Sequence, residues 1–78
     1  MGYTVSMRNE FTAIIEPAEE GGFWARCAEV PGANGQGETI AEVLDDLAAA
    51  VELMLDVMRT DALKRASPAA HSQTLVLA

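Results

Sequence analysis

The sequence predicts a single α+β domain in which a small antiparallel sheet packs on one long helix. Two short runs of β-forming residues flank an acidic, glycine-containing turn, which is the pattern of a β-hairpin. A third short run, one long amphipathic segment and a terminal apolar run follow, so the expected order is β-β-β-α-β. With 78 residues, the whole chain is expected to form one domain.

The predicted hairpin occupies the first third of the chain. Its first strand is FTAIIE, residues 11–16, which Pro17 ends. The turn AEEGG contains two glycines that are free to adopt positive φ. The second strand lies within GFWARCAEV, residues 22–30, and a short third strand is expected over residues 33–36.

A long helix is the clearest element of the sequence. The stretch from Thr39 to Glu42 is a capping box, in which the threonine oxygen accepts from the amide of Glu42 and the glutamate reaches back. The helix is expected to run to about Arg59. Its apolar arc covers about half of the circumference, which is wider than three short strands can bury.

This excess of apolar surface predicts a second copy of the chain as a partner. A chain of this size usually needs a disulfide, a metal or a partner subunit, and it has one cysteine and one histidine. A homo-oligomer, either a dimer or a tetramer, is therefore expected. The predicted interface residues are Leu47, Val51, Met54, Leu55, Met58, Leu75 and Leu77.

The two ends of the chain are expected to differ in structure. Residues 1–8 are expected to be a flexible extension. Residues 64–72 contain Pro68 and small polar residues, which is typical of a linker. The last six residues, QTLVLA, are apolar enough for a terminal strand that joins its own sheet or that of a neighbour.

The composition restricts the class of partner. Twelve acidic residues against five basic ones give a net charge of −7, the opposite of what phosphate binding requires, so direct nucleic-acid binding is not expected. An acidic surface suits a basic protein partner, although the same charge also keeps a small protein soluble. No secretory signal or membrane-length apolar segment is visible, so a cytoplasmic protein is expected.

The reactive side chains do not predict an enzyme. Cys27 lies in mid-strand on the presumed core face, and His71 lies in the linker. The adjacent carboxylates at 19–20 and 45–46 do not converge as general acid–base catalysis requires. The glycine loop before Thr39 has neither the dinucleotide nor the Walker spacing, so no cofactor and no metal are expected.

One strand face is a candidate for partner binding. Trp24 and Arg26 alternate with the presumed core residues and therefore share the opposite face. Tryptophan and arginine are enriched at binding hot spots, and Glu19 and Glu20 add an acidic turn nearby. The alternative is that Trp24 packs beneath the last strand.

The ordered string from residue 11 to about residue 55 resembles the HicB-like antitoxin family. The resemblance rests on Gly-Gly-aromatic at the second strand, Pro-Gly after it, and Gly-acid-Thr at the helix start. The matching residues are Gly21, Gly22, Phe23, Glu29, Pro31, Gly32, Gly37, Glu38, Thr39 and Glu42.

The resemblance implies a degraded, partial RNase H-like fold without the catalytic acids of the nuclease. It also implies an antitoxin that masks a small basic HicA-type toxin, which cleaves mRNA, and that forms dimers or tetramers. Members of the family usually continue into a DNA-binding segment. This chain has no basic helix after Pro68, so repression by direct DNA binding is not expected. The alternative function is an orphan HicB-like oligomer with a structural or small-ligand-binding role and no toxin.

Overall fold

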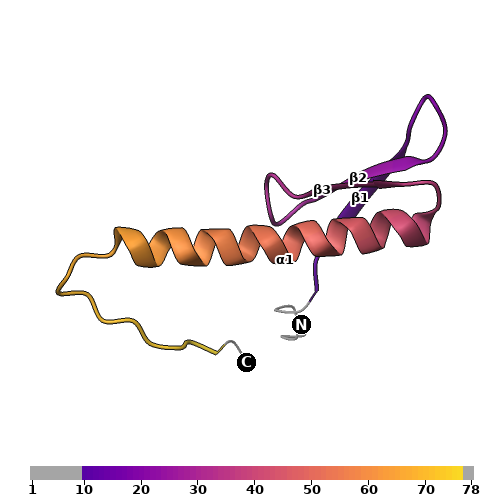
Figure 1. The fold of residues 1–78 in the computed structure, drawn as a ribbon. Helices are drawn as coiled ribbons and strands as arrows, with labels where there is room; N and C mark the ends of the chain where they lie inside the picture. Colours follow the sequence, from indigo (N-terminus) through magenta and orange to yellow (C-terminus); the bar gives the residue numbers. More distant parts are fainter. Residues whose placement is uncertain (1–9, 77–78) are drawn as a thin grey trace.

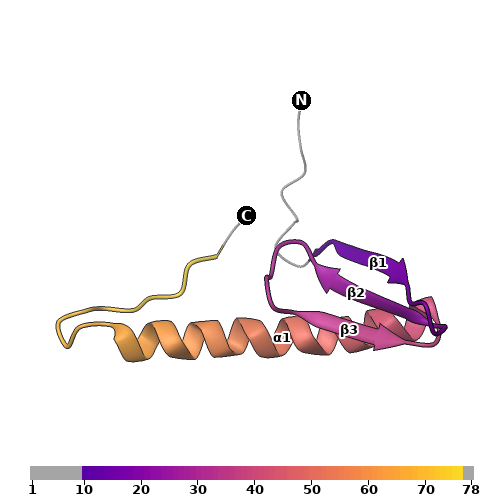
Figure 2. The same ribbon diagram turned by 90° about the horizontal axis from the view of Figure 1, so that it is seen from above.

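The computed structural model describes residues 10–76 and contains an antiparallel sheet of three strands followed by one long helix (Figure 1). The strand order is β1-β2-β3, and the helix packs on one face of the sheet (Figure 2). This arrangement confirms the predicted α+β class. The elements are β1 (Ala13–Pro17), β2 (Phe23–Cys27), β3 (Asn34–Gly37) and α1 (Ile40–Arg65).

The hairpin between β1 and β2 closes through its two glycines. Gly21 and Gly22 have φ values of 103° and 76°, a region that residues with a Cβ rarely adopt. The amide of Ala18 donates to the carbonyl of Gly22 at 3.0 Å, which fixes the turn. The resulting register places Ile15 opposite Ala25.

The core lies between the sheet and the first half of α1. Strand β2 alternates as the sequence predicts, with Ala25 and Cys27 buried and Trp24 and Arg26 exposed. Small side chains predominate, so the helix approaches the sheet closely. The buried core residues are Ala25, Cys27, Val30, Ala33, Val43, Leu47 and Val51.

The start of α1 confirms the predicted cap. The amide of Glu42 donates to Thr39 Oγ1 at 3.1 Å, and the Glu42 carboxylate accepts from the amide of Glu38 at 2.8 Å. One turn later, the carboxylate of Asp46 accepts from the amide of Gln36 at 2.8 Å. Strand β3 is at the edge of the sheet, so no further strand accepts from the amides of Gln36 and Glu38. Carboxylates of α1 accept from both amides instead.

The predicted end of the helix is wrong, because α1 continues to Arg65 rather than stopping near Arg59. No glycine or proline interrupts the segment before Pro68, and an ion pair joins Arg65 to Asp61 at 3.1 Å. Lys64 and Arg65 also lie in the last turn, where cations interact favourably with the helix dipole. The first two residues of the predicted 64–72 linker are therefore helical.

The predicted last strand is absent from residues 73–76, where Leu75 is 83% exposed. The helix carries the chain about 39 Å from its start, so the chain leaves it beyond the sheet (Figure 1). A strand needs a neighbouring edge for its backbone hydrogen bonds, and this segment reaches none. The predicted extension over residues 1–8 and the interface residue Leu77 lie outside the described residues.

Candidate partner-binding face

The outer face of the sheet presents Trp24 and Arg26, as the alternation along β2 predicts. Trp24 is 40% exposed, a large fraction for a side chain of its size. In the register of the sheet it lies between Glu16 of β1 and Gln36 of β3. Trp24 therefore lies on the side of the sheet that α1 does not cover.

Trp24 lines a hollow of about 600 Å³ at the hairpin end of the sheet. The same hollow is lined by Glu20 from the turn and by Glu38 and Glu42 from the start of α1. Three acidic residues and one aromatic residue thus line one concave surface, which we call the acidic groove. Its complete lining is Ala18, Glu20, Gly21, Phe23, Trp24, Gln36, Gly37, Glu38 and Glu42.

A close backbone approach brings these carboxylates together. A Cβ at Gly22 would lie 2.8 Å from the carbonyl oxygen of Gly37, so only glycine lets the turn rest on the end of β3. This contact places the turn residue Glu20 beside the start of the helix. The hydrogen bond from the amide of Glu38 orients the carboxylate of Glu42.

Of the four residues that the sequence predicted for partner binding, two line the acidic groove and two do not. Glu20 and Trp24 line the acidic groove. Arg26 lies one row further along the sheet, opposite Ile14 and Asn34, and Glu19 is exposed on the turn; neither lines the groove.

Two of the groove carboxylates were missed as candidate binding residues. The sequence analysis assigned Glu42 to the helix cap, which its hydrogen bonds confirm, and Glu38 only to the family motif before the helix. Their position beside Trp24 depends on the pairing of β2 with β3, which places Phe23 opposite Gly37. The Gly-Gly before Phe23 was the signal in the sequence that this end of the sheet is tightly packed.

Glu29, a residue of the family motif, has a structural role. Its carboxylate accepts from the Thr12 amide and from Thr12 Oγ1, both at 2.7 Å, and from Cys27 Sγ at 3.5 Å. These bonds tie the loop after β2 to the residue preceding β1. The hydrogen bond from the Thr12 backbone, followed by that from its hydroxyl, lowers the pKa of Glu29 to about 2.

Replacing Thr12 by valine is expected to raise the pKa of Glu29 toward its ordinary value of 4.5, because the hydroxyl donor is lost. A carboxylate with a lowered pKa stabilises the fold above pH 4.5 and loses that contribution as the pH falls toward 2. Thr12→Val should therefore make unfolding in acid begin at a higher pH. Carboxyl-carbon NMR titration measures the pKa directly.

Thr60→Val is the matched control for this titration, because Thr60 is an exposed helical residue on a different element. It should leave the Glu29 titration unchanged. An unaltered Glu29 pKa in Thr12→Val would show that the hydroxyl does not hold the carboxylate.

The Pro31-Gly32 pair of the motif forms the turn between β2 and β3. Gly32 has a φ of 93°, and a Cβ there would lie 3.3 Å from Met54 Cε. The amide of Ala33 donates to the carbonyl of Val30 at 3.2 Å across this turn. These residues shape the loop that packs on the middle of α1.

The predicted interface residues fall into three environments. Leu47 and Val51 are buried in the core of their own chain, and each presents only a small exposed edge to the hollow between β1 and α1. Met54 and Leu55 are partly buried against that core. Met58 and Leu75 are exposed.

The described residues contain no group of three or more histidine, cysteine, aspartate or glutamate side chains that can hold a metal ion. Cys27 is a free, buried thiol in the core. His71 is exposed, with its Nε2 3.2 Å from Gln73 Oε1. Within residues 10–76, α1 is too polar to cross a membrane.

These features define a small α+β protein with one acidic, aromatic-walled groove on the open face of its sheet. Comparison with known proteins identifies the group more narrowly. UPF0150 protein ssl0738 of Synechocystis sp. is 45% identical over 71 residues, which cover 91% of this chain and 99% of that relative. The chain belongs to the UPF0150 family, whose name states no activity. No family model matches the chain, and no solved structure matches it.

Proposed function

We propose that the chain is a non-enzymatic, antitoxin-like binding module that masks a small basic toxin of the HicA type, which cleaves mRNA. The observation that carries the proposal is the acidic groove, which Glu20, Glu38 and Glu42 line together with Trp24. No lysine or arginine lines this groove. A lysine or arginine side chain of a partner can stack on the indole ring and pair with a carboxylate there.

The charge of the whole chain supports the same class of partner. An RNA-cleaving protein must bind phosphates and therefore carries a basic surface. The net charge of −7 on this chain is complementary to such a surface, which favours rapid and selective association. Binding at that surface would exclude RNA from the toxin.

A HicB-like relationship is part of this proposal. The family motif supplies the tight turn at Gly22, the Glu29 hydrogen bonds and the Thr39 cap, and each has a structural role here. The order of three antiparallel strands and a helix is compatible with a partial RNase H-like fold. On this proposal the fold serves as a binding scaffold and not as a nuclease.

An orphan HicB-like oligomer is the second candidate function. The observation that favours it is an apolar groove of about 440 Å³ between β1 and α1, which is separate from the acidic groove. A chain whose main contacts are with itself, or with a small apolar ligand, would use this groove instead of the open sheet face.

The proposal is tested by affinity purification of the tagged full chain from its native host at low salt, with mass spectrometry of the bound proteins. A stoichiometric small basic protein is expected. That protein, purified alone, should cleave RNA, and addition of this chain should inhibit the cleavage. Repeated recovery of this chain by itself would favour the orphan oligomer.

A pair of charge reversals locates the contact. Glu20→Lys should weaken toxin binding by about tenfold or more, because it places a cation inside the acidic groove. Glu19→Lys makes the same change in net charge on the same turn but outside the groove lining, so a smaller loss is expected. Equal effects of the two variants would show that net charge, and not the groove, determines binding.

A further inference from the structure

The second half of α1 projects beyond the sheet (Figure 2). The buried residues of the helix are Val43, Leu47 and Val51, all in its first half. Beyond them, Val57, Met58 and Leu63 are each more than half exposed. The projecting half is thus an extended, partly apolar surface.

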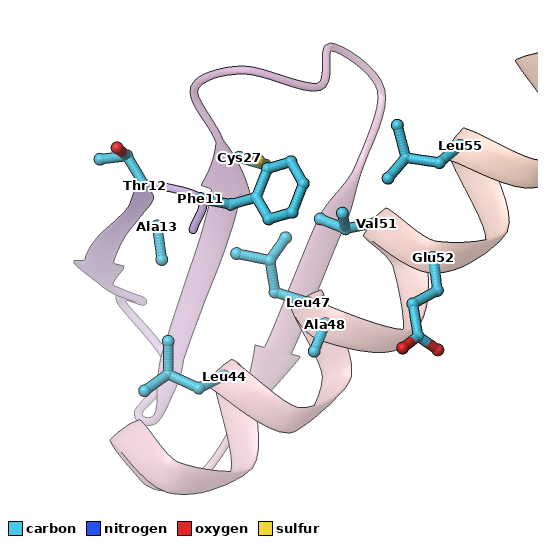
Figure 3. Close-up of a pocket in the computed structure, with 10 residues that line it drawn as sticks. All are labelled: Phe11, Thr12, Ala13, Cys27, Leu44, Leu47, Ala48, Val51, Glu52 and Leu55. Carbon is cyan, nitrogen blue, oxygen red and sulfur yellow. The ribbon is translucent and has the colours of Figure 1, made fainter. Parts of the chain in front are cut away.

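The apolar groove lies beside the other half of the helix (Figure 3). Phe11 and Cys27 approach it from the sheet side, and Leu44 and Leu55 flank it from α1. Phe11 and Leu44 are both more than 40% exposed, although they are large apolar side chains. The complete lining is Phe11, Thr12, Ala13, Cys27, Leu44, Leu47, Ala48, Val51, Glu52 and Leu55.

One line of helix residues connects the apolar groove with the projecting half. Its members alternate at spacings of four and three residues, which is the repeat of a helix–helix contact. The first four line the groove and the last two lie beyond it, over a length of about 27 Å. We call this line the seam: Leu44, Ala48, Val51, Leu55, Met58 and Ala62.

We propose that a second copy of this chain covers the seam, with the two α1 helices antiparallel about a two-fold axis near Leu55. The projecting half of each helix then fills the apolar groove of the other copy. Such a contact is self-complementary and closed, as expected for a symmetric dimer. This inference is independent of the proposed toxin binding, because the seam and Trp24 lie on opposite sides of the sheet.

The distribution of charge along α1 favours a second copy of this chain as the partner, and it favours the antiparallel direction of the two helices. Residues 40–52 of α1 carry four acidic residues and no basic one, whereas residues 53–65 carry three basic and two acidic ones. An antiparallel pair places the acidic half of each helix beside the more basic half of the other, and it also aligns the helix dipoles favourably. A parallel pair would place the two acidic halves together.

The same axis predicts a specific ion pair. With Leu55 at the centre, Ala62 of one copy lies opposite Ala48 of the other, and Glu52 of one copy lies near Arg59 of the other. In the single chain Arg59 pairs with Asp56 at 3.0 Å, but both side chains are highly exposed. An exposed pair of this kind is weak, so Arg59 remains available to the second copy.

The C-terminal residues 73–76 of the same chain are the rival occupant of the apolar groove. Two of them, Leu75 and Val76, are large apolar residues, and both are more than 70% exposed. A single added strand beside β1 would leave Met58 and Ala62 uncovered, because they belong to the second half of α1, which projects beyond the sheet (Figure 2). A second helix covers the whole seam.

The test is sedimentation equilibrium of the full chain over a wide range of concentration. A mass of twice the 8.3 kDa chain is expected. The variant Met58→Glu with Ala62→Glu should dissociate at least about a hundredfold more readily, because two charges enter the contact. It should retain the helical circular dichroism of the wild type, because neither residue belongs to the core.

The matched control is Leu53→Glu with Val57→Glu. These two residues are as exposed as Met58 but lie on the opposite side of the helix from the seam. The control variant should remain dimeric. Equal dissociation of both double variants would overturn the proposal, as would a wild type that stays monomeric at every concentration.

Charge exchange tests the antiparallel direction. Glu52→Arg alone should weaken the dimer by placing two arginines together, and Glu52→Arg with Arg59→Glu should restore it. Failure of the exchange to restore the dimer would overturn the antiparallel register. Leu75→Asp should leave the dimer intact, and loss of the dimer in this variant would show that the C-terminal segment forms the dimer contact, which would overturn the seam.

Discussion

Leu47→Ala is expected to lower the free energy of unfolding by about 2–5 kcal/mol. Leu47 is 4% exposed and lies at the centre of the contact between α1 and the sheet, between the backbone of Gly35 and the apolar groove. Truncation removes buried apolar surface and leaves a cavity that the small neighbouring side chains cannot fill.

The loss is large for this chain because small domains bury little of their surface and are marginally stable. Urea denaturation followed by circular dichroism measures it, at one fixed protein concentration so that association does not change the comparison. Leu53→Ala is the matched control, since Leu53 is 63% exposed, and it should change stability by no more than about 0.5 kcal/mol. A small effect of Leu47→Ala would mean that the helix does not rest on the sheet at this position.

Gly35→Ala is expected to destabilise the fold by about 1–3 kcal/mol, through overpacking and not through loss of a contact. A Cβ on Gly35 would lie 2.7 Å from the backbone nitrogen of Leu47 and 2.9 Å from its Cα. Backbone atoms of a helix cannot rotate away as the end of a side chain can, so the helix must move away from β3. Gly35→Val should be more damaging for the same reason.

Gln36→Ala is the control for the glycine variants, because it changes the next residue of the same strand on the exposed face. Its backbone bond to Asp46 is retained, so little loss of stability is expected. Wild-type stability in Gly35→Ala would show that α1 lies further from β3 than the structure places it. Thermal and urea unfolding of Gly35→Ala, Gly35→Val and Gln36→Ala measure these changes in stability.

The local elements were predictable because their signals are local. The alternation along β2 placed Cys27 on the core face and Trp24 on the opposite face, and the structure confirms this: Cys27 is buried and Trp24 is 40% exposed. The cap at Thr39 followed from its spacing to Glu42 and is confirmed by their hydrogen bond. Side-chain alternation and capping depend only on residues a few positions apart.

The wrong predictions concern features for which local signals are weak. The helix was expected to stop near Arg59, where no glycine or proline is present, and it continues to Arg65. The run Gln-Thr-Leu-Val at residues 73–76 suits a strand, but its conformation depends on whether a strand edge is within reach. Whether residues 73–76 can reach a strand edge depends on the length of α1. That length is set by the helix and not by the last residues themselves.

Local patterns and composition are enough to predict the α+β class, the two faces of β2, the cap of α1 and the excess of acidic charge. They do not predict which apolar helix residues face the sheet, and it is the packing of α1 that buries Leu47 and leaves Met58 exposed. They also do not predict that Glu38 and Glu42 line one groove with Trp24. Hairpin closure and helix packing bring together residues that are distant in the chain, and the spacing of these residues follows from backbone contacts such as that between Gly22 and Gly37.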